Sequence, residues 1–129
     1  MLAIDTNIVV RYLTADEPVQ ATNARRLIDA QNVFVSSTVM LESEWVLRSV
    51  YGYERSMLAN ALGAFAGLER VTLDDPPAIS KALAWMRGGM DFSDALHLAK
   101  AEGCEAFVSF DARFAKLAAS LNAPKVRVL

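Results

Sequence analysis

Four acidic residues that lie far apart in the sequence share one kind of position, where a short apolar run meets a helix-like segment. They are Asp5, Glu42, Asp94 and Asp111. In a parallel α/β sheet, strand ends and helix beginnings share one edge, and ligands bind there. Carboxylates about 5 Å apart repel by roughly 3 kcal/mol per pair at an effective dielectric near 20, so such a cluster needs protonation or a cation. Oxygen ligands favour Mg²⁺ or Mn²⁺, which hold phosphate oxygens and activate water, so the pattern indicates chemistry at phosphorus.

The scarcity of histidine and cysteine excludes the other common metal sites. Cys104 is the only cysteine and His97 is the only histidine, which excludes a disulfide framework and a multi-histidine zinc site within one chain. We expect Cys104 to be an inert core residue, and His97 to be buried and hydrogen-bonded rather than a proton shuttle. Trp45 and Trp85 lie on helical apolar stripes, which favours a core or an interface over base stacking.

The elements that must position the acids alternate between short apolar runs and longer helical segments. The expected strands cover residues 2–4, 33–35, 71–73, 106–109 and 126–128. The expected helices, with their start and stop signals, cover residues 7–13, 17–30, 36–50, 54–66, 74–89, 91–103 and 111–121. This alternation predicts the α/β class, as a three-layer α/β/α sandwich with a mainly parallel sheet of four or five strands. The strands lack polar alternation, which predicts that both of their faces are covered.

Length and composition predict a single globular domain over residues 1–129. The 129 residues are 53% hydrophobic and 22% charged, which is typical of a folded chain rather than a disordered one. No apolar run approaches the roughly 18 residues of a membrane span, so the mean hydropathy of +0.24 indicates a packed core or an apolar face for a partner. The net charge of −2 excludes a basic nucleic-acid coat but not a nucleic-acid enzyme. Because the first residues do not form a basic and apolar leader, we expect a cytoplasmic protein.

Helix capping competes with the catalytic interpretation for several polar residues. Asp74 and Asp75 precede two prolines, and capping of the following helix explains both. One of Asp91 and Asp94 is expected to be an N-cap, and the other a favourable charge at the positive end of the helix dipole. Thr6 is the expected cap of the first helix.

Two glutamates on one expected helix compete for a single place. Glu42 and Glu44 lie two residues apart, which is about 200° around a helix, so at most one of them can face the site. Glu42 shares its stripe with Val46, and Glu44 shares its stripe with Leu47. Periodicity alone leaves both open.

Four motifs in chain order resemble those of the PIN-domain ribonucleases, and within them the VapC-type toxins of toxin–antitoxin pairs. They are residues 4–13 (IDTNIVVRYL), 39–47 (VMLESEWVL), 91–99 (DFSDALHLA) and 107–114 (FVSFDARF). The resemblance covers essentially the whole chain and aligns the functional acid of the second motif with Glu42. In the fourth motif Ser109 stands where the family often has Thr, which keeps the hydroxyl group.

The resemblance implies a Mg²⁺- or Mn²⁺-dependent endoribonuclease that hydrolyses RNA and leaves a 5′-phosphate and a 3′-hydroxyl. Asp5, Asp94 and Asp111 would bind the metal directly, and Glu42 would bind it through water or orient the attacking water. Four further residues would hold these acids in place, namely Asn7, Ser109, Thr6 and Asp91. The implied strand order is 3-2-1-4-5, which places Asp5 next to Asp111.

Substrate and partners follow from charge and from the same resemblance. Substrate phosphates need cations, and the candidates are Arg11, Arg87, Arg113 and Lys116, each with an ordinary solvated surface as the alternative. The resemblance implies an RNA substrate, a small cognate antitoxin of the VapB kind and a homodimer. Residues 17–30 and 54–66 are the candidate surfaces for these protein partners.

Other classes fit the acids less well. A haloacid-dehalogenase-like phosphatase would need a second acid where Asn7 stands, as well as a cap domain. A receiver domain would need an acidic pair near the first strand and a late lysine. The serious alternative is a non-catalytic PIN-like module that binds RNA or protein. Retention of all four mutually repelling acids favours the enzyme.

Overall fold

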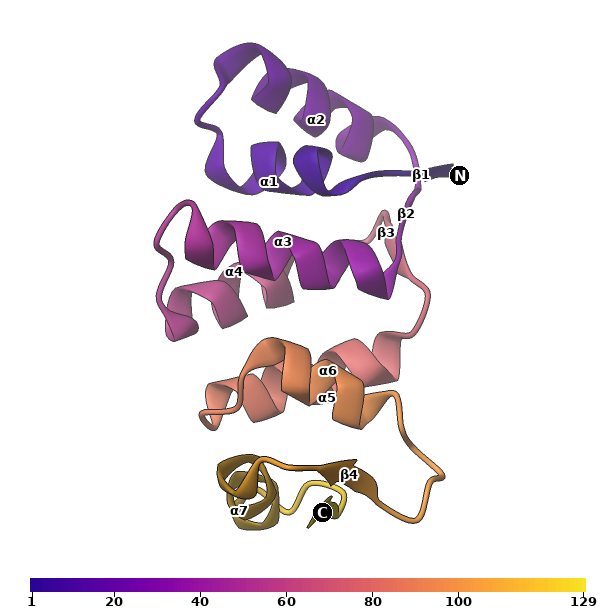
Figure 1. Ribbon diagram of the computed structural model, residues 1–129. Coiled ribbons are helices and arrows are strands. Elements are labelled where there is room, and N and C mark those ends of the chain that lie inside the picture. Colours follow the sequence, from indigo (N-terminus) through magenta and orange to yellow (C-terminus); the bar gives the residue numbers. More distant parts are fainter. The chain divides into compact units, whose positions relative to one another are not determined.

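The computed structural model describes all of residues 1–129 and divides them into two compact units (Figure 1), residues 1–75 and residues 76–129. Each unit combines helices with short parallel strands. None of the helices is long and apolar enough to cross a membrane. The α/β class expected from the sequence is therefore confirmed, while the single domain remains a prediction.

The first unit carries a three-stranded parallel sheet with the order β1-β2-β3. Leu2 pairs with Val33, and Val33 pairs with Val71, so the three strands run in register toward one edge. The elements are β1 (Leu2–Ala3), α1 (Thr6–Thr14), α2 (Pro18–Ala30), β2 (Val33–Val35), α3 (Ser37–Ser49), α4 (Arg55–Ala66) and β3 (Val71–Leu73). Asp5 follows β1, and α3 begins right after β2, so both lie at the edge where the strands end.

Helical periodicity explains how α1 and α2 pack. Ala21, Ala24 and Ile28 recur at helical spacing on α2 and are buried, as are Val9 and Val10 on α1. Small alanines on α2 let the two helices approach closely, and Figure 1 shows them side by side. Each fully buried valine or isoleucine stabilises the fold by about 1.5–3 kcal/mol.

The second unit carries a two-stranded parallel sheet of β4 and β5, in which Phe107 pairs with Val126. Its elements are α5 (Pro76–Arg87), α6 (Phe92–Ala99), β4 (Phe107–Ser109), α7 (Ala112–Ser120) and β5 (Val126–Val128). The orders β1-β2-β3 and β4-β5 match the two parts of the expected order 3-2-1-4-5. Adjacency of β1 and β4 remains a prediction.

The turn between α5 and α6 depends on its glycines. A Cβ atom on Gly88 would lie 2.6 Å from Cδ2 of Leu121, so only glycine fits without moving that side chain. Gly89 adopts a φ of 115°, a backbone conformation that other residues rarely adopt. This turn brings α6 back along α5 and thereby sets where the first turn of α6, with Asp94, lies.

Three expectations about elements are wrong. The helix expected over 91–103 ends at Ala99, because the backbone bonds shorten to an i,i+3 turn from Ala101 to Leu98 before Gly103 adopts a φ of 89°. Cys104 in that turn region is exposed rather than a core residue. The strand expected to be buried at residues 2–4 has only two residues at the edge of its sheet, and Leu2 is 47% exposed.

The structure also differs from the expectations for Trp45 and Asp74. Trp45 is exposed, so it does not belong to the core, and its place in an interface stays a prediction. Asp74 accepts hydrogen bonds from the Ser37 backbone N–H at 3.1 Å and from its hydroxyl at 2.5 Å. Asp74 therefore serves the first turn of α3, a neighbour in space, in addition to preceding α5.

Candidate active site

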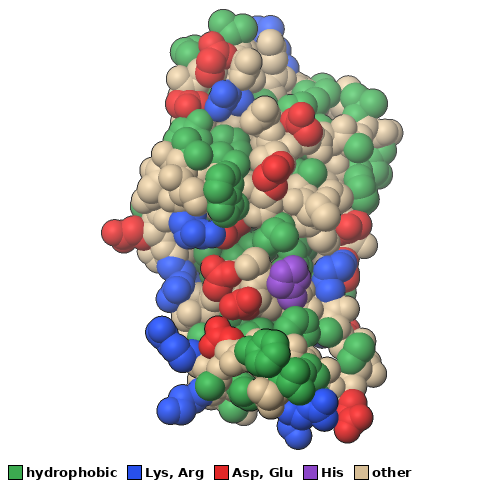
Figure 2. Space-filling model, in the orientation of Figure 1, with side chains coloured by type: hydrophobic (Ala, Val, Ile, Leu, Met, Phe, Trp, Pro, Cys, Tyr) green, Lys and Arg blue, Asp and Glu red, His purple; other side chains and the backbone are tan.

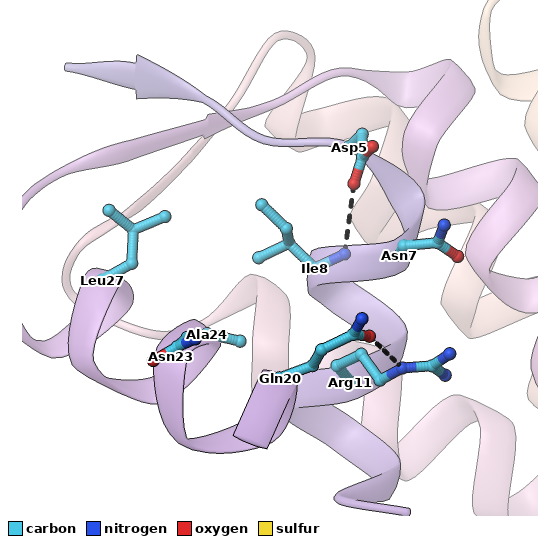
Figure 3. Close-up of a pocket in the computed structure, with 8 residues that line it drawn as sticks. All are labelled: Asp5, Asn7, Ile8, Arg11, Gln20, Asn23, Ala24 and Leu27. Atoms are coloured by element: carbon cyan, nitrogen blue, oxygen red, sulfur yellow. Dashed lines mark hydrogen bonds between the residues drawn. The ribbon is translucent and has the colours of Figure 1, made fainter. Parts of the chain in front are cut away.

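Asp5, the first candidate acid, stands between β1 and α1 and caps the helix. Its Oδ1 accepts a hydrogen bond from the backbone N–H of Ile8 at 3.2 Å. The side chain is exposed and forms part of the wall of a cavity of about 380 Å³ on the first unit, drawn in Figure 3. Capping engages Oδ1, so Oδ2 is available to a cation or to water.

Glu42, the second candidate acid, is held by the residue that follows Asp5. The hydroxyl of Thr6 donates a hydrogen bond to Oε1 of Glu42, and Thr6 is buried. This bond ties the Glu42 carboxylate to the segment that carries Asp5. Thr6 is therefore not the helix cap that the sequence predicts, because Asp5 caps α1 and the threonine hydroxyl serves Glu42.

Glu44, two residues further along α3, lies in a different environment. It is 2% exposed, and Arg48 donates to it from Nε at 3.1 Å. A buried carboxylate is costly unless it is paired, and the i,i+4 spacing on a helix brings these two side chains together. The structure thus distinguishes Glu42, which faces Thr6, from Glu44, which faces the interior, where periodicity does not.

The candidate acids of the second unit share one cavity. Asp91, Asp94 and Asp111 line a hollow of about 400 Å³ together with Arg113 and Lys116. Asp94 lies in the first turn of α6, and Asp111 is the N-cap of α7. The structure therefore brings together the third and fourth motifs of the sequence.

Asp111 resembles Asp5 in its local role. Its Oδ1 accepts hydrogen bonds from the backbone N–H groups of Arg113 at 2.9 Å and Phe114 at 3.1 Å. The hydroxyl oxygen of Ser109 accepts from the backbone N–H of Asp111 at 3.0 Å. Ser109 therefore orients the backbone of Asp111, whereas the carboxylate is oriented by the first turn of α7.

Asp94 is the candidate acid that the protein leaves without a hydrogen-bond donor, and its electrostatic setting is unfavourable. Burial raises the pKa of Asp94, the negative charges of Asp91 and Asp111 raise it further, and His97 opposes the rise. Figure 2 shows acidic side chains (red) on the same face as the single histidine (purple). His97 is exposed rather than buried, because its position on α6 faces away from the packed stripe of Ala95 and Leu98.

Asp91 also lies beside Asp94, but its role differs from the expected capping. It is the N-cap of α6 by backbone position, yet its side chain makes no capping hydrogen bond. Instead, the Ser93 hydroxyl donates to Asp91 Oδ2 at 2.5 Å. The Asp91 carboxylate therefore lies close to Asp94 and accepts no hydrogen bond from a backbone N–H group of α6.

The carboxylate oxygens in the cavity of Asp94 and Asp111 suit a hard divalent cation as ligands. No three His, Cys, Asp or Glu side chains gather closely enough in the structure to hold a metal ion by themselves. Asp94 and Asp111 nevertheless offer carboxylate oxygens whose charges oppose one another, and a cation would relieve that repulsion. Mg²⁺ commonly binds one or two carboxylates and keeps several waters. The residues present therefore fit a hard divalent cation.

The four candidate cations fall into three settings. Arg113 and Lys116 line the cavity of Asp94 and Asp111 and are exposed, so they are placed to meet phosphates there. Arg87 ends α5 and does not line that cavity. Arg11 lines the cavity of Asp5, where its guanidinium already has protein partners on other residues.

Sequence reasoning missed two amide residues on α2. Gln20 and Asn23 line the cavity beside Asp5, and Gln20 Oε1 accepts a hydrogen bond from Arg11 Nε at 2.8 Å. They carry no motif. The available signal is their i,i+3 spacing next to the buried Ala24, which places polar side chains on the flank of the stripe that packs against α1.

Comparison with known proteins identifies the family. The chain has parallel strands, N-cap acids at Asp5 and Asp111 and an acid, Asp94, in the first turn of α6, and it matches the PIN domain over residues 2–120. It therefore belongs to the PIN domain family, as its motifs predict.

Comparison with individual proteins finds similarity to a solved structure. No curated protein matches the chain. Among solved structures, the chain is similar to the crystal structure of Mycobacterium tuberculosis VapC20, described as a Sarcin-Ricin loop cleaving toxin. The two are 21% identical, the match covers 98% of this chain and 99% of the other, and the TM-score is 0.46.

Proposed function

We propose that this protein is a metal-dependent endoribonuclease that acts as the toxin of a toxin–antitoxin pair. The observation that carries the proposal is the cavity of Asp94 and Asp111, in which repelling carboxylates lie beside Arg113 and Lys116 in a chain of the PIN family. An oxygen-only donor set next to cationic side chains suits a phosphodiester, because the acids take a cation and the cations meet phosphate.

The roles of the residues follow from their chemistry. Asp94 and Asp111 bind Mg²⁺ or Mn²⁺, which supplies Lewis acidity toward phosphate oxygens and lowers the pKa of water. Arg113 and Lys116 hold the substrate phosphates beside these acids. Asp91 adds negative charge next to Asp94 and so strengthens cation binding.

The remaining site residues belong to the first unit. We assign Asp5 and Glu42 to the same reaction as further acids, with Asp5 binding metal and Glu42 binding metal or orienting the attacking water. Thr6 holds Glu42 through its hydroxyl. Asn7 lines the cavity beside Asp5 and is assigned to orient that acid.

The partners are proposed on the same basis. The substrate is RNA, and the products carry a 5′-phosphate and a 3′-hydroxyl. A small antitoxin of the VapB kind would restrain the nuclease in the cytoplasm, and the chain would form a homodimer. The exposed apolar side chains Val19 on α2 and Met57 on α4 are consistent with partner surfaces on these two helices.

Cleavage of RNA by the purified protein tests the proposal. We expect fragments with 5′-phosphates in the presence of Mg²⁺ or Mn²⁺, complete inhibition by EDTA, and recovery when metal is added back. The variant Asp111→Asn should be inactive while it keeps its fold by circular dichroism. RNA that is bound but left intact in the presence of both metals would instead identify a non-catalytic PIN module.

A further inference from the structure

The cavity beside Asp5 has a lining that the proposed metal chemistry does not use. It lies between α1 and α2, and Figure 3 shows that both helices contribute to its walls. Its polar lining besides Asp5 consists of Asn7, Arg11, Gln20 and Asn23, and its apolar lining of Ile8, Ala24 and Leu27. Its volume of about 380 Å³ falls in the lower part of the roughly 300–1,000 Å³ range of small-molecule sites. A mixed lining of this kind suits a flat, partly polar group.

Charge in this cavity argues against a phosphate as its occupant. Arg11 is its only cationic side chain, and Asp16 lies 3.4 Å from Arg11 Nη1 as an ion-pair partner. The hydroxyl of Tyr51 lies 3.0 Å from the same nitrogen. Asp5 adds a negative charge at the cavity wall. A phosphate site needs unpaired positive charge, and this cavity offers none in excess.

One hydrogen bond within the lining fixes the orientation of the Gln20 amide group. Arg11 Nε donates to Gln20 Oε1 at 2.8 Å, so this amide oxygen is engaged and the Gln20 NH₂ group is left to donate. Arg11 Nη2 has no partner in the structure and adds further N–H donors. Asn23 and Asn7 contribute amides that can rotate to match an occupant. The cavity therefore presents a fixed donor pair, with adaptable amides beside it.

We infer that this cavity receives one RNA base next to the cleaved bond and prefers the keto bases guanine and uracil. The inference rests on the proposed ribonuclease function, because Asp5 in the same wall is assigned to the reaction. Guanine offers O6 and N7 as acceptors and uracil offers O4, whereas adenine and cytosine present amino donors at the corresponding positions. An amino group would face the donors of Gln20 and Arg11. Ile8, Ala24 and Leu27 supply apolar contact for the base faces.

The first arm of the test measures binding without catalysis. Guanosine, uridine, adenosine and cytidine 5′-monophosphates are titrated in EDTA, and the side-chain amide signals of Gln20 and Asn23 are followed by NMR. We expect both signals to shift with the guanosine and uridine compounds, with binding about tenfold tighter than for the other two. Because no metal is present, this arm decides on the cavity even if the protein cleaves no RNA.

The second arm measures cleavage of RNA oligonucleotides that differ only in the base next to the cleaved bond. Gln20→Glu turns a donor into an acceptor and should shift the preference about tenfold toward adenine and cytosine. Asn23→Asp provides a second, independent variant that should move the preference in the same direction. Gln31→Glu adds the same charge at the end of α2, outside the cavity, and should leave the preference unchanged.

The outcomes separate this inference from the proposed function. Amide shifts with a keto preference and no cleavage would support the base site and reject the ribonuclease. Cleavage with no amide shift and no change of preference in the variants would reject the base site and keep the ribonuclease. In that case a protein segment would be the better occupant of the cavity.

Discussion

Asp94 in the second unit is held differently from the candidate acids of the first unit, Asp5 and Glu42. In the first unit, Asp5 accepts the backbone N–H of Ile8, and Glu42 accepts the hydroxyl of Thr6. In the second unit, Asp94 accepts no hydrogen bond from the protein and lies among other negative charges, which raise its pKa together with burial. The acids of the first unit are thus already stabilised by the folded chain, whereas Asp94 is destabilised by it.

This difference indicates where a cation contributes most. A group left unpaired and repelled by its neighbours gains more from a bound cation than a group that already accepts hydrogen bonds. Asp94 should therefore dominate both metal affinity and the electrostatic cost of the metal-free state. The Asp5 and Glu42 pair should act mainly through geometry.

Asp94→Asn should cause the largest loss of activity. Removing the carboxylate takes away several kcal/mol of interaction with a metal and its substrate, so RNA cleavage should fall by roughly 10³-fold or more. Single-turnover cleavage with saturating Mn²⁺ measures the effect. Asp29→Asn, an exposed position on α2, is the matched control and should retain wild-type activity. Equal activity of Asp94→Asn and Asp29→Asn would show that Asp94 takes no part in the reaction.

Asp94→Asn should also be more stable toward unfolding than the wild type, in EDTA at neutral pH. Because the folded-state pKa of Asp94 is raised above 3.8, the folded protein binds the proton more tightly than the unfolded chain, and stability falls as pH rises from about 3.8 through the raised value. Asn carries no charge and avoids this loss, so the Tm of Asp94→Asn should be higher than that of the wild type at pH 7.

Two controls test the cause of this stabilisation. The difference in Tm between the variant and the wild type should shrink as the pH falls below the raised pKa of Asp94. Addition of Mn²⁺ should raise the Tm of the wild type more than that of Asp94→Asn. A Tm difference that is independent of both pH and metal would mean that the stabilisation has nothing to do with charge.

Thr6→Val should have an intermediate effect on catalysis. Valine has nearly the same shape, but it cannot donate to Glu42, so the carboxylate loses its orientation and cleavage should fall by about 10- to 100-fold. Thr22→Val removes an exposed hydroxyl that donates to Pro18 on α2, and it should leave cleavage unchanged. If Thr6→Val cleaves as well as this control, the hydroxyl does not position Glu42 for the reaction.

Much of the fold could be predicted because local signals agree with the structure. Residues 33–35, 71–73 and 126–128 are expected strands and form β2, β3 and β5 with those bounds. Their apolar runs are short and clearly flanked by turn and cap residues. The end of α6 was not predictable, because residues 100–102 have good helix propensity, and the change to an i,i+3 turn depends on packing.

The candidate site divides in the same way. Pairing of Asp94 with Asp111 in one cavity follows from strand ends and helix beginnings, which sequence patterns reveal. The hydrogen bond from Thr6 to Glu42 and the exposure of His97 depend on the rotation of each helix about its axis. Motif spacing does not fix that rotation within the tens of degrees that decide which side chain faces a neighbour.

Tyr51→Phe should give the smallest effect and tests the contrast from the opposite side. The hydrogen bond that the Tyr51 hydroxyl donates to Asp16 Oδ2 at 2.6 Å is the main cause that lowers the pKa of Asp16 below 3.8. The variant should therefore move that pKa upward, which a titration of the Asp16 carboxyl carbon by NMR measures. Because Asp16 is exposed, water replaces the lost donor and Tm should change little. Tyr53→Phe is the matched control. An Asp16 pKa that is the same in Tyr51→Phe and Tyr53→Phe would show that the Tyr51 hydroxyl does not stabilise the Asp16 carboxylate. The contrast between this hydrogen-bonded carboxylate of the first unit and Asp94 would then fail.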